Sequence, residues 1–495
     1  MSTSYYKHLN VHKSVGDLKN LTSVNLKDCQ KLKRLPKNFY RLKSVETLVL
    51  NGCSRFEILD EKLGKLVSLT TFLANKTAIT EVPSAIVRLK KLEQLSLCDL
   101  KRPLQLPPSL RGLYSLTQLS LKNCNLSALP KDLGSLFSLE RLDLSENSFH
   151  SFPNFSGLSN LLTLSLDECN LTDDAIDSVN LGSLSYLRHL GLQNNHFHTL
   201  PSLSGLAKLE DLYLEHCTNL GLIKDLPTSL ELLCASHCTA LERMPNFSEM
   251  SPEYVEINNC PKLIEFPGLH KALNSGMSLS MKTRNNISDI LLEESMLQGW
   301  NGRAQLDLAG SDIPKWFKHV GEGGQVHFEV PLGCSPTSLA MCMVYSSCDK
   351  NSDYPASFCV INHTKRASFI ARSDYFYETF GEDFLWVGHL SNYELNLEGG
   401  DSVHVVAEIP GFNFRVKKIG IRLVYDKFIN EKSFEGIQFF VPYLQGKRRI
   451  STDDDDDDDD DEGDDDDDDD EDDDEAGPSH HTSKKMRLDP SIGPK

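Results

Sequence analysis

Long apolar runs are missing from this sequence. No uninterrupted stretch of about 18 apolar residues occurs, which is roughly what a helix needs to cross a bilayer, and the N-terminal segment 1–16 has no apolar region typical of a secretory signal. The sequence therefore predicts an intracellular, cytoplasmic protein. Short basic clusters at 447–449 and 484–487 leave nuclear import open, although such clusters are common by chance.

Sets of side chains with catalytic or metal-binding spacing are also missing. No Ser/His/Asp or Cys/His set stands out, and the glycines of 321–324 lack the lysine of a phosphate loop, which favours a hairpin turn. His196 and His198 lie in a repeat turn with no third ligand, and this favours polar surface over a metal site. We expect no enzymatic activity, no cofactor and no metal.

A basic excess is absent as well. The segment Asp453–Glu475 holds 22 acidic residues and no basic one, and setting it apart from the net charge of −20 leaves +2. A nearly neutral folded part has no field that would attract nucleic acid or membrane, so neither is an expected partner. Residues 446–495 are predicted to be a disordered acidic tail, which acts either as a solubilising tether or as a cover for a basic surface.

What the sequence does contain is a repeat. The frame L-x-x-L-x-x-L-x-L-x-x-(C/N/T) recurs at steps of 22 to 26 residues, and two weaker copies around 230–238 and 254–260 bring the total to about eleven units. The x-L-x-L-x portion alternates as a strand with one buried face, and such strands bury that face only by stacking. We predict an α/β leucine-rich-repeat solenoid over residues 1–270. The frames begin at Leu18, Leu42, Leu66, Leu89, Leu113, Leu136, Leu158, Leu184 and Leu206.

Seven of the thirteen cysteines occupy the twelfth position of this frame. Asn147, Asn195 and Thr77 share the position, so a small polar or thiol side chain is expected to satisfy backbone groups of the turn. Structural thiols are therefore favoured over disulfides or zinc. Apolar-Pro pairs such as Leu35-Pro36 follow in most units and should shape the return of the chain.

Residues between the strand leucines should project from the concave face, where core packing does not dictate their identity. Units six to nine turn acidic there and carry one aromatic, Tyr213. We predict a protein partner with a basic patch anchored on that tyrosine, since charge-ringed aromatics are typical binding hot spots; the alternative is a solvated surface with an accidental charge bias. The candidate binding residues are Asp143, Glu146, Asp167, Glu168, Gln193, Asp211, Tyr213, Glu215 and His216.

A different period begins near residue 303, after a linker or cap (271–302) with a short helical pattern near 290–292. Alternating segments at 325–330, 403–409 and 419–425, separated by turn residues over 303–445, predict an all-β jelly-roll or immunoglobulin-like sandwich of undetermined strand order. Trp316 and Phe317 are expected to pack at an edge of this sandwich, rather than to form an exposed ligand platform.

The motif Ile313-Pro314-Lys-Trp316-Phe317, the strand-like segment 339–345 and the segment 417–425 together resemble the post-repeat jelly-roll (C-JID) domain of plant TIR-NB-LRR disease resistance proteins. The repeats match the style of that family, and the resemblance covers about residues 17–445. It implies recognition of a pathogen effector or guarded host protein by the repeats together with the jelly roll. The sequence departs from the family in having no phosphate loop and no upstream signalling domain, so it has no residues for nucleotide switching or NAD cleavage.

Two functions remain in view. The first is the ligand-recognition part of an intracellular plant immune receptor, either truncated or acting with a full-length receptor. The second is a non-enzymatic leucine-rich-repeat scaffold in signalling, which would not need the Trp-Phe sandwich domain. A hydrolase or sugar-processing site would require a carboxylate or nucleophile cluster that is not evident in the sequence.

Overall fold

A computed structural model describes residues 11–281, 306–309, 311–347, 357–372, 383–408, 414–425 and 448–449. The chain divides into two compact units, 1–450 and 451–495. The acidic segment and the helical pattern expected at 290–292 lie outside the described residues. None of the described helices combines the length and apolarity needed to span a bilayer.

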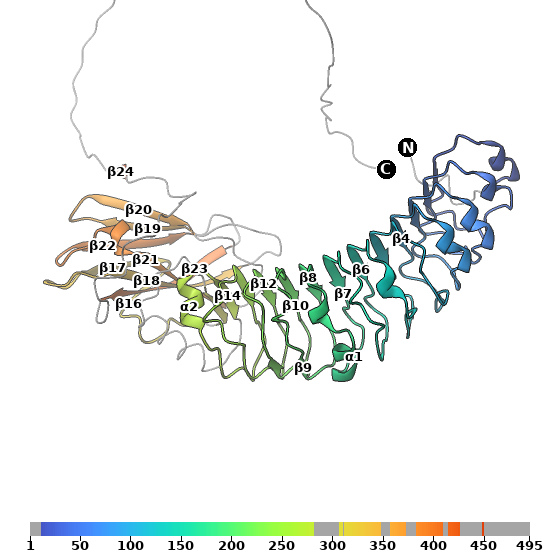
Figure 1. The fold of residues 1–495 in the computed structure, drawn as a ribbon. Coiled ribbons are helices and arrows are strands. Elements are labelled where there is room, and N and C mark those ends of the chain that lie inside the picture. The colour runs from blue at the N-terminus through green and yellow to red at the C-terminus, as the bar shows by residue number, and fades with distance from the viewer. Residues whose placement is uncertain are drawn as a thin grey trace, which may run out of the picture. The chain divides into compact units, whose positions relative to one another are not determined.

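A ladder of short parallel strands forms the first part of unit 1, with each strand paired to the next along the chain. Figure 1 shows these strands stacked along one side of the coil. The predicted leucine-rich-repeat solenoid is confirmed, and every predicted unit carries a strand at the predicted place. The strands are β1 (Ser23–Asn25), β2 (Thr47–Val49), β3 (Thr71–Leu73), β4 (Gln94–Ser96), β5 (Gln118–Ser120), β6 (Arg141–Asp143), β7 (Thr163–Ser165), β8 (His189–Gly191), β10 (Asp211–Tyr213), β12 (Leu232–Cys234), β13 (Tyr254–Glu256) and β14 (Ser278–Met281).

The last of these strands, β14, lies beyond residue 270, where the sequence suggested a linker or cap. It follows the short helix α2 (Leu269–Asn274) and pairs in parallel with β13. The ladder therefore continues into that segment, because Leu279 and Met281 are apolar and buried like the strand leucines before them.

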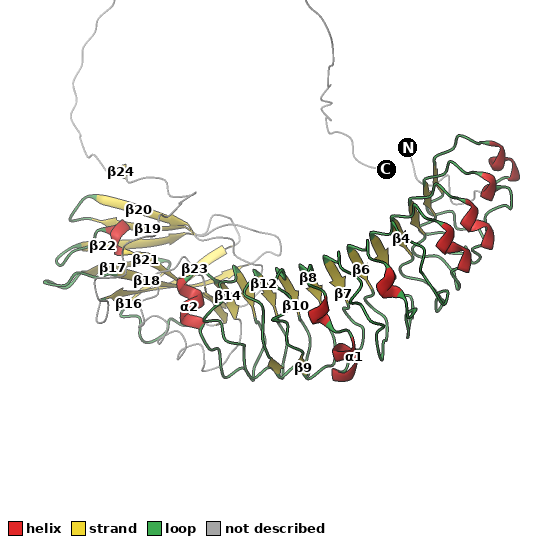
Figure 2. Ribbon diagram, viewed as in Figure 1, coloured by secondary structure: helices red, strands yellow, loops and turns green. Residues whose placement is uncertain are grey.

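The return segments on the opposite side of the coil are mostly loops and single turns of helix (Figure 2). The 3-10 turns after the first place one or two apolar residues of the repeat in the interior, as Phe39 and Leu63 illustrate. These elements are η2 (Lys13–Asp17), η3 (Phe39–Arg41), η4 (Glu61–Lys65), η5 (Ser84–Arg88), η6 (Leu133–Ser135), η7 (Leu181–Ser183), α1 (Asp173–Ser178), β9 (Thr199–Leu200) and β11 (Leu222–Ile223).

The twelfth frame position does what the sequence predicts. The Cys169 thiol donates to the carbonyl of Leu144, one repeat earlier, at 3.2 Å, and Cys238 does the same to Leu214 at 3.1 Å. At Asn147, the side-chain oxygen instead accepts from the Leu126 amide at 2.9 Å while its NH2 group donates to the Leu144 carbonyl. Burial raises the pKa of Cys169 to about 12, so this thiol stays protonated and serves as a donor.

Two antiparallel sheets form the second part of unit 1 and share a core between them. The predicted strands at 325–330, 403–409 and 419–425 correspond to β17, β22 and β23. One sheet has the order β15 (Leu306–Ala309), β21 (Asp383–Ser391), β18 (Ser338–Ser347), β23 (Phe414–Val424) and β16 (His319–Glu322); the other has β17 (Gln325–Glu329), β22 (Ser402–Glu408), β19 (Ser357–Asn362), β20 (Ala367–Arg372) and β24 (Arg448–Arg449). Helix α4 (Asn392–Leu395) follows β21.

Two details differ from the sequence expectation. The turn at Gly323 and Gly324, both with positive φ, joins β16 to β17, but these strands pair in different sheets, so it is not a hairpin. The Gly323 amide donates to the Lys417 carbonyl on β23 instead of closing a two-stranded loop. Strand β24 also falls inside the segment predicted as tail, where it pairs with β20.

The ladder and the first sheet of the sandwich are one continuous sheet, because β15 pairs in parallel with β14 and antiparallel with β21. Strand β18 is buried on both faces. Met341 and Met343 point into the sandwich core, whereas Cys342 and Val344 belong to the core cluster that runs through the ladder. This double burial explains why 339–345 is a continuous apolar run instead of an alternating one.

Candidate functional site

The strand face of the ladder carries two rows of side chains. The pairing register aligns the last residue of every ladder strand from Asn25 to Glu256 in a single row, and a second row lies two residues further along each repeat. The candidate residues Asp143 and Tyr213 belong to the first row, and Asp167, Gln193 and Glu215 belong to the second.

Hydrogen bonds between repeats fix part of this face. The Asn75 side-chain oxygen accepts from the Cys98 amide at 2.8 Å, and the Asn51 side-chain oxygen accepts from the Asn75 amide at 2.8 Å. The Ser236 hydroxyl likewise accepts from the Asn258 amide at 3.0 Å. Several polar side chains of this face therefore bridge adjacent turns.

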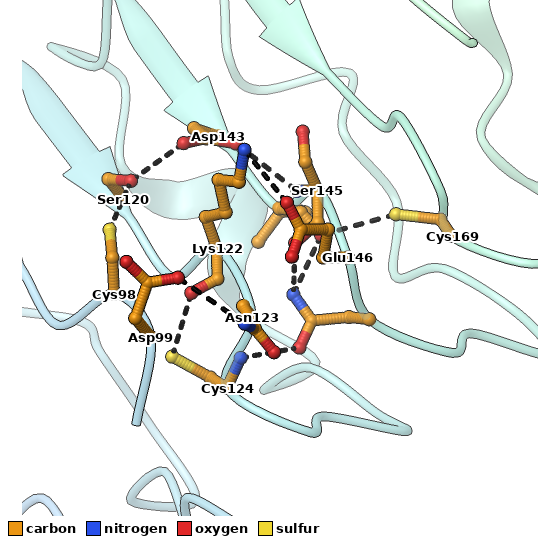
Figure 3. Close-up of polar contacts among 12 residues, drawn as sticks. Cys98, Asp99, Ser120, Lys122, Asn123, Cys124, Asp143, Ser145, Glu146 and Cys169 are labelled. Atoms are coloured by element: carbon orange, nitrogen blue, oxygen red, sulfur yellow. Dashed lines mark hydrogen bonds and ion pairs between the residues drawn. The ribbon is translucent and has the colours of Figure 1, made fainter. Parts of the chain in front are cut away.

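The acidic part of the face begins at repeats five and six (Figure 3). The Asp143 carboxylate accepts from the Ser120 hydroxyl at 2.8 Å and from the Ser145 amide at 3.2 Å. Glu146 forms an ion pair with Lys122 at 2.9 Å. Glu146 is thus paired with a cation within the protein, whereas the Asp143 carboxylate has hydrogen bonds but no ion pair in the described structure.

Asp167 lies across the next repeat. Its carboxylate accepts from the Gln193 amide at 2.9 Å and occupies the space above Gly191, where a Cβ would come within 2.7 Å of it. Burial first, and Asp143 more weakly, raise the pKa of Asp167. Glycine at 191 therefore makes room for this half-buried carboxylate.

Around repeat nine, Asp211 is paired and Tyr213 stands beside it. The Asp211 carboxylate contacts His189 Nδ1 at 2.6 Å. Tyr213 is half-buried, and burial followed by Asp211 raises the pKa of its hydroxyl. The tyrosine is accessible enough to contact a partner, whereas the Asp211 carboxylate already has a partner in His189.

Glu215 is the most perturbed acid on this face. Burial is the largest cause, with contributions from Glu256 and Asp167, and together they raise its pKa to about 7. Its Oε2 atom is buried with no hydrogen-bond partner in the described structure. A cationic group brought to this position would relieve both the burial of charge and the missing hydrogen bond.

Residues flanking the second row lie in the left-handed backbone region. Glu146, Glu168 and His216 have φ of 57°, 54° and 60°. Asn and Asp tolerate this conformation well, and they occupy the position in five of the eleven repeats, at Asp28, Asp99, Asn123, Asn194 and Asn259. The exposed Glu168 has no ion pair among the described residues, while His216 stacks on His237 with ring centroids 4.4 Å apart.

The sandwich motif packs inward. Phe317 is buried and Trp316 and Ile313 are half-buried against the same core cluster, next to the buried Pro314. Gly420 on β23 allows this approach, because a Cβ there would lie 2.5 Å from Ile313 Cγ2. The motif therefore helps to cover the outer side of β23.

The structure also brings together groups that sequence reasoning did not connect. His327, His363 and His404 form a cluster on the sandwich, and burial followed by the two neighbouring imidazoles lowers the pKa of His404. Their sequence separations carry no recognisable spacing, so only the strand pairing could reveal them. His198, by contrast, contacts Asp173 at 3.1 Å and belongs to no such group of three in the described part of the chain.

The repeats are similar in sequence to plant disease resistance proteins. The chain is 39% identical over 155 residues to the TMV resistance protein N of Nicotiana glutinosa, covering 30% of this chain and 14% of that protein. It is 36% identical over 164 residues to the disease resistance-like protein DSC1 of Arabidopsis thaliana, covering 32% and 13%. The chain thus matches less than one sixth of the length of either relative, and their names indicate no catalytic activity in the matched region.

Among solved structures, a leucine-rich-repeat protein of Leptospira interrogans is 26% identical, covers 59% of this chain and 74% of that one, and has a TM-score of 0.46. No family model matches the chain.

Proposed function

We propose that this chain is the ligand-recognition part of an intracellular plant immune receptor and that it binds a protein ligand, either a pathogen effector or a guarded host protein, on the strand face of repeats six to nine. The observation that carries the proposal is the set of carboxylates left without a cationic partner on that face. Asp143, Asp167, Glu168 and Glu215 have no ion pair in the described structure, and the accessible Tyr213 stands among them.

This face fits a partner with a small number of basic side chains, not a strongly cationic one. Two of the predicted acids already have partners within the ladder, since Glu146 forms an ion pair with Lys122 and Asp211 contacts His189. Glu215 is only partly ionised near neutral pH because its pKa is about 7. Buried or half-buried carboxylates that meet a matching cation contribute mainly to specificity and to the dissociation rate.

The sandwich is proposed to hold the same ligand through its loops. Its strand order supports the predicted jelly roll, since β16-β23-β18-β21 and β17-β22-β19-β20 are the two four-stranded sheets of that fold. The shared sheet through β14, β15 and β21 fixes the first of these sheets to the end of the ladder. A ligand that spans both parts would meet a preorganised surface, which reduces the entropy lost on binding.

The test uses the full chain as bait on extracts of healthy and infected plant tissue, followed by affinity measurement with the identified ligand. Tyr213→Ala and Glu168→Lys change the proposed face without removing an inter-repeat hydrogen bond. Glu57→Lys is the matched control, because it makes the same charge change at an exposed position away from the face. We expect a pathogen or host protein whose affinity falls about tenfold or more in the first two variants, as for hot-spot residues, and is unchanged in the control.

The competing function is a signalling scaffold, and one observation favours it. Tyr114 and Phe137 are each 50% exposed and stack with ring centroids 6.4 Å apart, outside the proposed face. The scaffold function predicts that the same complex is captured from healthy and infected tissue. It also predicts that Tyr114→Ser and Phe137→Ser abolish this capture, whereas Tyr213→Ala does not. That result would favour the scaffold function over immune recognition.

A further inference from the structure

Three histidines from distant parts of the sequence lie on one face of the second sheet of the sandwich. His327 on β17 is the register partner of His404 on β22, and Ile361 on β19 is the partner of His404 on the other side. His363 follows two residues after Ile361, and its amide donates to the Ser402 carbonyl at 2.9 Å, which keeps it beside β22. Side chains two residues apart on a strand point to the same side, so all three imidazoles share one face.

That face is the outer one. Val326 and Phe328 flank His327 and are buried in the sandwich core, and Val403 and Val405 flank His404 in the same way. His327 and His363 are exposed and His404 is half-buried. The imidazoles therefore do not belong to the core, and the core does not explain their presence.

The donor atoms are already gathered. One ring nitrogen from each histidine lies within 4.8 Å of the others. The rings of His327 and His404 stack with centroids 3.8 Å apart, and His404 Nε2 is buried with no hydrogen-bond partner in the described structure. Leaving a buried ring nitrogen unsatisfied costs free energy, which a ligand to that nitrogen would recover.

We propose that His327, His363 and His404 bind a late first-row transition-metal ion, of which Zn2+ is the expected one. Imidazole nitrogen suits zinc, copper and nickel, whereas magnesium and calcium select oxygen ligands. Three imidazoles leave a further coordination position for water or for a side chain of a bound partner. This site is separate from the strand face of the ladder and does not depend on the proposed function.

Binding requires the ring nitrogens to close by a short distance and the rings, which are stacked at interplanar angles of 13° to 18°, to turn toward a common point. Zinc holds imidazole nitrogens at about 2.0–2.1 Å, so tetrahedral ligands lie about 3.4 Å apart. From a separation of at most 4.8 Å, each pair must close by no more than roughly 1.4 Å. Rotation of the two exposed side chains supplies this movement while the three strands stay paired.

The first measurement is calorimetric titration of the chelator-treated full chain with ZnCl2 in excess Mg2+, which occupies carboxylates of the acidic segment. The variants are His327→Gln, His363→Gln, His404→Gln and the triple substitution. His237→Gln is the matched control, because it removes one ring from the stacked pair of His216 and His237, which has no third imidazole beside it among the described residues. Melting in chelator checks that each variant folds, and the exposed His327 provides a variant with little structural risk.

We expect one zinc per chain, an affinity that falls at least about tenfold in each single variant, no such binding in the triple variant and no change in the control. Titration with CoCl2 should give ligand-field bands without the charge-transfer absorption of a thiolate. Zinc binding of equal affinity to the wild type and the triple variant, absence of binding, or a thiolate spectrum would each overturn the site.

Discussion

The repeat ladder and the sandwich provide hydrogen-bond partners for their buried strands in opposite ways. In the ladder, each strand pairs with a strand one repeat away, and the same frame positions repeat the same hydrogen bonds. In the sandwich, β18 pairs with β23, whose residues lie about 80 positions later, as in the pair of Leu339 with Leu423. Local repetition makes the ladder's polar contacts interchangeable between units, whereas each contact in the sandwich occurs once.

The ladder and the sandwich meet at a junction where they share a sheet and a core. We expect the largest effect on stability from a substitution at this junction. Phe317→Ala should lower the free energy of unfolding by about 3–5 kcal/mol, since it empties a buried aromatic position. Urea unfolding measures the loss, and hydrogen exchange should show faster exchange at β14. Phe149→Ala, also buried but in the middle of the ladder, is the control; if it accelerates exchange at β14 equally, the two parts do not meet through Phe317.

The next largest effect on stability compares a polar contact that recurs in the ladder with one that occurs once in the sandwich. Asn147→Ala removes buried hydrogen bonds to the Leu126 amide and the Leu121 and Leu144 carbonyls, and we expect a loss of about 3 kcal/mol. Asn147→Cys should recover a large part of it, because a thiol at this frame position donates to the preceding repeat.

In the sandwich, the corresponding pair of substitutions is made at Asn362. Asn362 donates to the Asp401 carboxylate at 2.8 Å and accepts from the Lys365 amide at 3.0 Å. Asn362→Cys should be as destabilising as Asn362→Ala, because no thiol is used at an equivalent position. Chemical denaturation measures the stability of all four variants. If cysteine restores stability equally at positions 147 and 362, the acceptance of cysteine in the ladder does not come from its repeat.

The same contrast sets how much could be predicted from sequence. The ladder strands, their register and the role of Cys169 or Asn147 follow from one frame, because the partners of each residue lie one repeat away. Four strands of the sandwich were predicted, at 325–330, 339–345, 403–409 and 419–425, but the strand order and the approach of His327 to His404 depend on pairing across about 80 residues. On the binding face, the rows were predictable, whereas the pairing of Glu146 with Lys122 and the burial of Glu215 depend on side-chain packing.

A smaller effect comes from Glu215 in the ladder. Its folded-state pKa of about 7 lies above the ordinary 4.5, so the folded state binds the proton more tightly and stability falls as pH rises from 4.5 through 7. Glu215→Gln should therefore be more stable than the wild type at pH 8, by less than about 1 kcal/mol because solvent screens the group, and the gain should vanish near pH 4.5. Denaturation at both pH values tests this, with the exposed Glu168→Gln as control; a pH-independent gain would refute burial of charge as the cause.

The smallest effect on stability concerns Lys122, yet it bears most directly on binding. Its ion pair with Glu146 is largely exposed, so Lys122→Met should cost only about 0.2–0.5 kcal/mol, and high salt should remove the difference. The hydrogen bond to Glu146 is the main reason that the pKa of Lys122 is raised, so the pair is fully present at pH 7 and is lost only above the lysine pKa. Freeing Glu146 adds an unpaired carboxylate to the face, and an oligo-arginine peptide should bind this variant more tightly than the wild type. Lys131→Met removes an exposed charge elsewhere; equal gains in both variants would mean that net charge, and not the strand face, attracts the cation.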